Sequence, residues 1–324
     1  MYIIFLIILI LFFLEIYSYK KYKNSIYSKT NLFIPHYYCH FILNSNFKNE
    51  KIYIDNNNFR YYKKNNISKS NLYLSGDCNF FESELFTKET LGYFLEKKKI
   101  KILNPSCPHY SILHQFNRLI FDLKNNIRIK NLLFSASVND VLLLLNNNID
   151  KKPDGSNFYK PFDYSNNIFP RIRLFYSRYF IFYIFRKMKK TTYQLEKNMI
   201  VKTPFNNINS KNLRIMDKNF NSSNILDTLK MLKFICKEKK INLILSTFAV
   251  KNSEMSKYKH RKKIKHYLKK INNIFRIFAK ENNIRLIDFE KIFKNKEACM
   301  RNKWDYNFKG NKIRSEEILK KLIN

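Results

Sequence analysis

The sequence predicts a three-layer α/β domain with a central parallel sheet, on three observations. From Asn71 onward, short apolar runs alternate with segments of helical periodicity, as in parallel sheets whose crossover helices cover both faces. Hydrophobic residues make up 45% of the chain, which excludes a disordered protein. With 324 residues, the chain can form one domain of about 250 residues and an N-terminal extension.

The N-terminal extension begins with the apolar run YIIFLIILILFFL, residues 2–14. A membrane-spanning helix needs about 17–25 residues, a length that the run reaches at Tyr19 if Glu15 lies near the membrane interface. A signal peptide is the alternative, but its usual basic start and small-residue cleavage site are not seen. We therefore expect an uncleaved transmembrane anchor over residues 1–19. The lysines that follow favour a cytoplasmic body, but the whole chain is basic, so the orientation stays open.

Residues 20–65 are polar, basic and rich in Asn, Lys and Tyr, and we expect a linker there with one strand at 51–54. The α/β domain is expected over residues 66–324. Its predicted strands cover 72–75, 100–104, 131–137, 241–247 and 284–289, and its predicted helices cover 82–99, 110–126, 222–240, 266–283 and about 311–323. An insertion at about 145–220 interrupts the alternation. Its aromatic and basic stretch, 170–190, is expected to pack on the domain, and a membrane surface is the alternative.

Polar residues follow several of the predicted strands. In a parallel α/β sheet the ligand binds outside the carboxyl ends of the strands. Cys78, Ser106, Asn139 and the loop after Phe289 all fall at that edge. The sequence therefore predicts a functional site there.

Four blocks of the predicted domain resemble those of the SGNH (GDSL-type) hydrolases in order and spacing, over about residues 70–324. LYLSGDCNFF resembles the first block, in which a strand runs into Gly-Asp-Ser, and ILNPSCPHYS (102–111) resembles the second, Asn-x-Gly followed by a Pro-Gly turn. FSASVNDV (134–141) resembles the third block, Gly-x-Asn-Asp, and NKWDYNFKGNKI (302–313) resembles the last, Asp-x-x-His followed by Gly-Asn. The resemblance implies a flavodoxin-like sheet and hydrolysis of an ester.

The chain departs from the family pattern at the positions that carry the chemistry. Cys78 stands where the family has its nucleophilic serine, Asp305 where it has its catalytic histidine, and Asn302 where it has its acid. Ser106 and Ser137 stand where the family blocks have glycine. Four other block residues are the same as in the family, namely Asn139, Asp140, Gly310 and Asn311. The chain has only four glycines, and Gly76 and Gly310 are two of them. We expect that the backbone requires glycine at both positions.

The resemblance implies attack by Cys78 on an ester carbonyl, with the oxyanion held by Asn139 and by the backbone N–H groups of Cys78 and Ser106. A helix N-terminus stabilises a thiolate, so Cys78 needs a base less than a serine would. Asp305 is a poor base, because an ordinary carboxyl pKa near 4 makes removal of a thiol proton uphill by roughly 6 kcal/mol. His109, in the second-block loop, is the candidate replacement for the histidine. The alternative reading makes Cys78 an inert small residue in a bend.

Charge and cysteine content narrow the function classes. The formal net charge is +36, but the basic residues are spread along the chain and no nucleic-acid motif is present. This disfavours a nucleic-acid partner, although a charge-driven binder of nucleic acid or anionic lipid stays the third hypothesis. Five separated cysteines form neither a metal spacing nor a disulfide framework. Cys39 between His36 and His40 is too crowded for a metal site, so we expect neither metal nor cofactor.

The first hypothesis is therefore an acyl esterase of the SGNH kind that removes an acyl group from a carbohydrate or lipid of the cell envelope. Its expected partners are that acylated substrate and the membrane, through residues 2–19. By resemblance to the family, the globular domain is expected outside the cytoplasm. The second hypothesis is a catalytically inactive binding or scaffold protein of the same fold, because the acid–base pair of the family is replaced.

Overall fold

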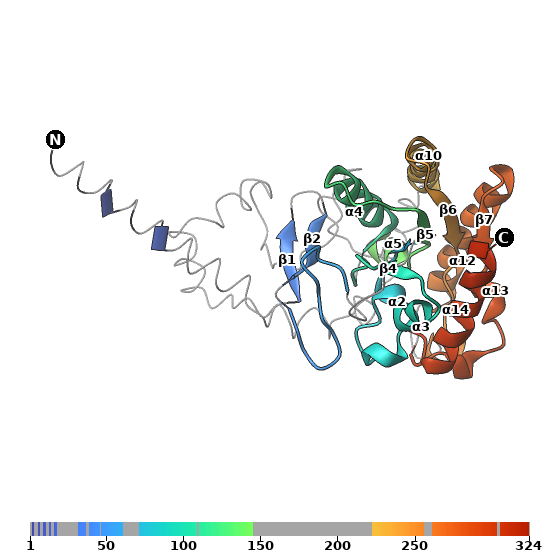
Figure 1. Ribbon diagram of the computed structural model, residues 1–324. Helices are drawn as coiled ribbons and strands as arrows, with labels where there is room; N and C mark the ends of the chain where they lie inside the picture. The colour runs from blue at the N-terminus through green and yellow to red at the C-terminus, as the bar shows by residue number, and fades with distance from the viewer. Residues whose placement is uncertain are drawn as a thin grey trace.

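The computed structural model describes scattered positions between 2 and 17, and then residues 32–60, 71–144, 222–255, 261–302 and 305–323, with gaps at 37, 38, 46 and 109. Figure 1 shows how these parts are arranged along the chain. The predicted insertion at about 145–220 lies outside the described residues. Most of the predicted anchor over residues 1–19 does too. A search of the described residues finds no helix that is both long and apolar enough to span a bilayer.

A five-stranded parallel sheet forms the centre of the domain. Its strands are β3 (Asn71–Ser75), β4 (Lys101–Leu103), β5 (Asn131–Ser135), β6 (Asn242–Ser246) and β7 (Arg285–Ile287). The strand order is β4-β3-β5-β6-β7, so the chain crosses to one side of β3 and then returns to the other. This is the flavodoxin-like order, and its switch point lies between β3 and β5. The predicted strands and the predicted parallel sheet are confirmed.

Helices cover both faces of this sheet, as the sequence predicts (Figure 1). On one face lie α4 (Ile112–Lys124), α10 (Ser222–Glu238) and α12 (Arg261–Glu281), and on the other lie α3 (Leu91–Lys97), α13 (Phe289–Ile292) and α14 (Phe308–Ile323). Strand side chains alternate between the two cores: Leu132 and Phe134 of β5 pack on the first group of helices and Leu133 on the second. The described domain therefore has the three-layer α/β/α architecture that the sequence predicts.

One predicted helix, residues 82–99, is wrong in its first half. The one-turn helix α2 (Cys78–Phe81) ends at Glu82, whose φ of 55° is left-handed. A turn and the short 3-10 helix η1 (Thr87–Glu89) follow, and the side chain of Thr90 caps α3, which begins only at Leu91. Apolar spacing alone does not reveal this break, because of the two apolar residues in the turn Leu85 is buried and Phe86 is exposed. The side chain of Glu82 is itself buried.

Residues 32–60 pack on the domain instead of forming the expected linker. The strands β1 (Phe33–His36) and β2 (His40–Leu43) form an antiparallel hairpin. Its apolar side chains share a core with Phe81, Cys107 and Tyr110 of the domain. The strand expected at 51–54 consists of two isolated bridges. This segment is buried by contacts with residues that lie far away in the sequence. Its own polar composition therefore does not predict that it is buried.

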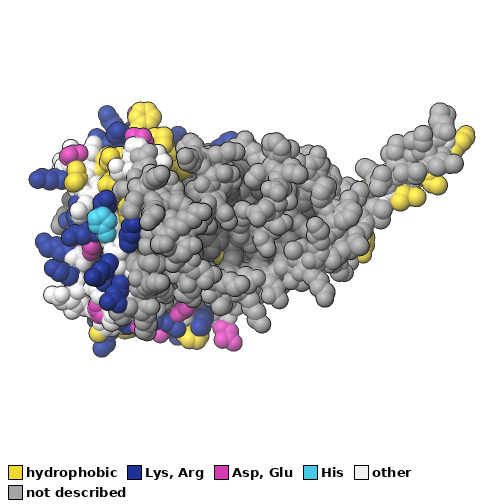
Figure 2. Space-filling view, turned by 180° about the vertical axis from the view of Figure 1, so that it is seen from behind, with side chains coloured by type: hydrophobic (Ala, Val, Ile, Leu, Met, Phe, Trp, Pro, Cys, Tyr) yellow, Lys and Arg dark blue, Asp and Glu magenta, His cyan; other side chains and the backbone are white. Residues whose placement is uncertain are grey.

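Lys and Arg side chains are spread over the described part of the surface that Figure 2 shows, with Asp and Glu between them. This distribution agrees with the basic residues being spread along the sequence. It does not single out one basic block.

Candidate functional site

The first element of the site is the turn between β3 and α2. Asp77 caps the one-turn helix by accepting a hydrogen bond from the backbone N–H of Asn79 at 3.0 Å. Cys78 is the first helical residue and is half-buried. A Cβ atom on Gly76 would lie 2.4 Å from the ring of Phe80. The close packing of the Phe80 ring therefore favours glycine at this position, whereas the backbone conformation expected to require it is not left-handed.

The second element is the start of α5 (Asn139–Leu144), which follows β5 across the switch point. The side-chain nitrogen of Asn139 donates a hydrogen bond of 3.0 Å to Oδ2 of Asp77, and Oγ of Ser137 donates one of 2.6 Å to the same oxygen. The other carboxyl oxygen of Asp77 lies 3.7 Å from Sγ of Cys78. Asp77 thus joins Cys78 to Asn139, so the structure brings these two predicted site residues to one edge of the sheet.

Two of the three predicted oxyanion donors, Asn139 and Ser106, already have hydrogen-bond partners within the protein. The side-chain nitrogen of Asn139 also donates to the carbonyl oxygen of Tyr110 at 3.2 Å, which engages both of its N–H groups. The backbone N–H of Ser106 donates to Oδ1 of Asn104 at 3.0 Å, and Oγ of Ser106 donates to the carbonyl of Leu74 at 2.7 Å. Holding an oxyanion would require these bonds to be exchanged.

The last block supplies Asp305 and Asn302, which lie together. The side-chain nitrogen of Asn302 donates a 2.7 Å hydrogen bond to Oδ2 of Asp305, and the backbone N–H of Asp305 donates a 2.8 Å bond to Oδ1 of Asn302. The remaining oxygen, Oδ1 of Asp305, is buried and has no hydrogen-bond partner among the described residues. These two hydrogen bonds fix the Asp305 side chain relative to Asn302.

Burial dominates the electrostatics of the site. It raises the pKa of the Cys78 thiol well above its usual value, and the charges of Asp77 and Asp305 raise it further. At neutral pH the thiol is therefore protonated. The expected stabilisation of a thiolate by the helix is wrong, because α2 is a single turn and both nearby charges are negative.

The three acids at this edge are shifted in the same direction. Burial raises the pKa of Asp305 to about 7, that of Asp77 to about 6 and that of Asp140 to about 8. The carboxylate of Asp140 accepts the backbone N–H of Ile112 at the start of α4, at 3.1 Å. The pKa near 4 that the sequence suggested for Asp305 is therefore wrong, because the carboxyl is desolvated. An acid that titrates near neutrality can both accept and return a proton.

The histidine expected as a replacement, His109, lies outside the described residues. His114 is buried, and its Nδ1 lies 2.8 Å from Oγ of Ser111, which caps α4. Its ring stacks on Tyr110. His36 is partly buried, and its Nδ1 accepts the backbone N–H of Cys39. No group of three or more potential metal ligands occurs among the described residues.

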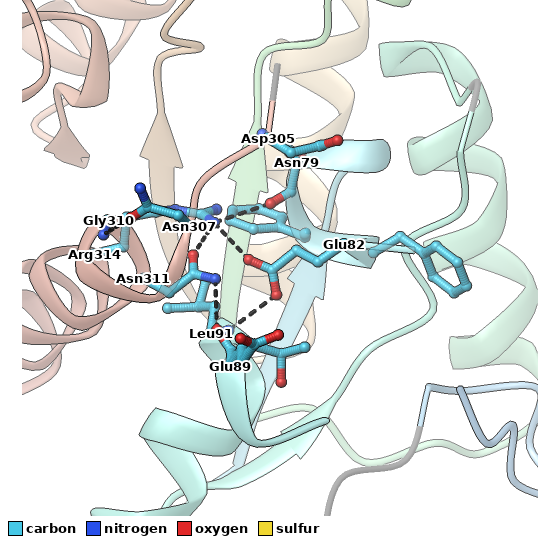
Figure 3. Close-up of polar contacts among 12 residues, drawn as sticks. Asn79, Glu82, Glu89, Leu91, Asp305, Asn307, Gly310, Asn311 and Arg314 are labelled. Carbon is cyan, nitrogen blue, oxygen red and sulfur yellow. Dashed lines mark hydrogen bonds and ion pairs between the residues drawn. The ribbon is translucent and has the colours of Figure 1, made fainter. Parts of the chain in front are cut away.

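Sequence reasoning missed a buried ion pair beside the turn that carries Cys78, shown in Figure 3. Nη1 of Arg314, in α14, lies 3.1 Å from Oε1 of Glu82, and both side chains are fully buried. The same nitrogen donates to Oδ1 of Asn311 at 3.0 Å, and the Asn311 side chain donates to the carbonyl of Glu89 at 3.0 Å. The signal in the sequence was the Gly-Asn pair of the last block, one turn before Arg314.

A Cβ on Gly310 would lie 2.2 Å from the carbonyl oxygen of Cys299.

Comparison with known proteins gives results at the level of structure alone. No family model matches the chain. No curated protein matches it either. Among solved structures, the chain is similar to the acetyl xylan esterase AlAXEase, at 15% identity over 78% of this chain and 99% of that one, with a TM-score of 0.41. It is also similar to a member of the lipolytic protein G-D-S-L family from Veillonella parvula DSM 2008, at 10% identity over 78% and 97% of the chains (TM-score 0.42).

A third similar structure is the acetylxylan esterase Axe2 from Geobacillus stearothermophilus, at 12% identity over 79% of this chain and 94% of that one, with a TM-score of 0.43. The assignment of an SGNH-type fold rests on the chain itself. Its strand order is flavodoxin-like, and the described residues of the first three blocks follow the carboxyl ends of β3, β4 and β5.

Proposed function

We propose that this chain, whose described domain has an SGNH-type α/β fold, is an acyl esterase with Cys78 as its nucleophile. One observation carries the proposal. The carboxylate of Asp77 contacts both Sγ of Cys78 and the side chain of Asn139, and the charge of Asp305 acts on the same thiol. Residues of the first and third blocks therefore meet at the switch point of the sheet, where ligands of such folds bind.

The proposed reaction uses Asp305 in place of the histidine. The thiol proton of Cys78 moves to the Asp305 carboxylate while Sγ forms a bond to the ester carbonyl carbon. The tetrahedral intermediate collapses, the ester C–O bond breaks, and the leaving alkoxide takes the proton from Asp305. Water then hydrolyses the thioester by the same route, which releases the acid and regenerates the thiol. A pKa of about 7 suits Asp305 to returning the proton, whereas removal of the thiol proton stays uphill because the pKa of Cys78 is raised well above its usual value.

The expected substrate is an acylated carbohydrate or lipid of the cell envelope. This follows from the resemblance of the four blocks to the SGNH hydrolases. Two of the similar solved structures are described as acetyl xylan esterases, and acetylated sugars are the first substrates to test. We also propose that residues 1–19 anchor the protein in a membrane with the globular domain outside the cytoplasm. Carbonate extraction of membranes and protease accessibility of the tagged domain would test both parts.

A chromogenic short-chain ester tests the activity. The full chain should hydrolyse it, and Cys78→Ala should lose the activity, whereas Cys299→Ala, which removes another half-buried thiol, should retain it. The pH profile should rise through a pKa of about 7, because Asp305 must be ionised to accept the proton. Equal hydrolysis by the wild-type protein and Cys78→Ala would overturn the proposal.

A catalytically inactive binding or scaffold protein of the same fold is the second candidate, and a specific observation favours it. Both N–H groups of the Asn139 side chain are engaged by Asp77 and Tyr110, and the thiol is held protonated. Absence of hydrolysis by the wild-type protein, with activity appearing in the double variant Asp305→His, Asn302→Asp, would identify an enzyme that has lost its acid–base pair.

A further inference from the structure

The helix that carries Cys78 is too short to hold itself in place. α2 has four residues, Cys78–Phe81, and an isolated single turn is unstable because its nucleation cost is not repaid by further hydrogen bonds. The last four carbonyl groups of any helix also lack partners within the helix. Because α2 has only four residues, most of its carbonyl groups are among those that lack a partner within the helix. The carbonyl of Cys78 is bonded by the backbone N–H of Glu82, so the later carbonyls must find partners elsewhere.

Two buried guanidinium groups from distant parts of the chain provide those partners. Nη1 of Arg60 donates to the carbonyl of Phe81 and, at 2.8 Å, to that of Glu82, and Nη2 reaches the carbonyl of Leu85 at 3.2 Å. From the other side, Nη1 of Arg314 donates to the carbonyl of Asn79 at 3.0 Å. The remaining carbonyl, that of Phe80, accepts from the side chain of Asn104 at 2.9 Å.

Charge and packing make this arrangement rigid. Hydrogen bonds from charged donors are stronger than those between neutral groups. The Arg60 and Arg314 side chains are almost fully buried. The guanidinium of Arg60 lies 5.3 Å from the ring centroid of Phe81, and that of Arg314 lies 4.9 Å from the ring of Phe80. Each arginine thus holds both the backbone and a side chain of α2.

We propose that Arg60 and Arg314 are positioning residues that fix Cys78 at the site by clamping the C-terminal end of α2. The proposal rests on the assignment of Cys78 as the nucleophile. It makes residues 32–60 part of the functional unit, because Arg60 belongs to that segment. Neither arginine contacts the reacting atoms; both act through the helix.

The rate of alkylation of Cys78 tests the clamp without requiring hydrolysis. The full chain is treated with iodoacetamide at several pH values, and the Cys78 peptide is quantified by mass spectrometry. Arg60→Lys keeps the charge but cannot reach three carbonyls at once. Loss of a charged hydrogen bond shifts a local equilibrium by at least about tenfold, so Cys78 should react about tenfold faster in Arg60→Lys. The midpoint of its pH profile should fall toward that of an ordinary thiol.

Arg285→Lys is the matched control, because Nη1 of Arg285 donates to the carbonyl of Lys321, away from α2. It should leave Cys78 alkylation unchanged. If Arg60→Lys does not fold by circular dichroism, Arg314→Lys is measured instead. A folded clamp variant with unchanged alkylation rate and midpoint would overturn the proposal.

Ester hydrolysis separates this inference from the proposed function. If the chain is an esterase, the folded clamp variant should have a lower kcat at a similar KM, since the nucleophile is misplaced and substrate binding is not. If Cys78→Ala shows that the protein has no thiol-dependent esterase activity, faster alkylation in the clamp variant still supports the clamp, and unchanged alkylation rejects it.

Discussion

Two aspartates at the same edge of the sheet perform the same local task in opposite electrostatic surroundings. Asp77 follows β3 and caps α2, and Asp288 follows β7 and caps α13 by accepting the N–H of Lys291. Asp77 is fully buried and has no cationic partner among the described residues, and burial raises its pKa to about 6. Burial also raises the pKa of Asp288, but hydrogen bonds from Arg276 and Thr247 outweigh it and lower the pKa overall.

The difference separates a structural cap from a candidate site. Asp288 forms an ion pair with Arg276 and is partly exposed, so its charge is stabilised. The cap and the ion pair together give it a structural role. Asp77 uses its oxygens to hold Ser137 and Asn139 beside a thiol. A buried carboxyl with no cation costs stability. Such a group is typical of positions where chemistry is performed.

The largest effect is expected where a buried carboxylate does have a cation, at Glu82. Glu82→Ala leaves Arg314 buried and unpaired, so the free energy of unfolding should fall by about 3–5 kcal/mol. Urea denaturation followed by circular dichroism measures the change. Glu290→Ala, which removes a half-exposed partner of Arg276, is the control and should cost about 0–1 kcal/mol. Similar losses in the two variants would show that burial does not distinguish these pairs.

The comparison of the two caps predicts opposite dependences of stability on pH. The pKa of Asp77 is raised from 3.8 unfolded to about 6 folded, so the folded state binds the proton more tightly. Stability should therefore fall by about 2 kcal/mol as the pH rises from 4 to 6. Asp288 has a lowered folded pKa, so its contribution is present above its unfolded pKa and is lost as the pH falls through the folded one.

Unfolding curves at pH 3, 4, 5 and 6 for the wild type, Asp77→Asn and Asp288→Asn measure this difference. The substitution of Asp77 should remove a downward slope of stability with rising pH, whatever its effect at one pH. The substitution of Asp288 should remove an upward slope. The same change of slope in both variants would contradict the distinction between the two caps.

A smaller loss of stability is expected from Gly76→Ala, which tests how tightly the turn that carries Cys78 is packed. The added Cβ would lie 2.4 Å from the Phe80 ring and 2.8 Å from Oδ1 of Asn79. Overpacking of this kind costs about 1–3 kcal/mol, and the midpoint of thermal unfolding should fall accordingly. Because the backbone of Gly76 is not in the left-handed region, an unchanged midpoint would mean that the helix can shift to make room.

The sequence by itself determined the order of strands and helices, the parallel sheet and the placement of Cys78, Ser106 and Asn139 at its carboxyl edge. Apolar periodicity is a local property of the chain, so it is visible before folding. Apolar periodicity did not predict the break at Glu82, because the buried Glu82 side chain is stabilised by Arg314, which is 232 positions away in the sequence. For the same reason the burial of residues 32–60 was missed.

Only the tertiary structure decided the charge states of the site. The residues Asp77, Asp288 and Asp305 are the same amino acid, and each has the same pKa in an unfolded chain. Desolvation and the presence or absence of a neighbouring guanidinium shift those values in different directions. Both causes depend on which distant segments pack together, and this is the physical reason why residue type and spacing could place the site but could not assign its protons.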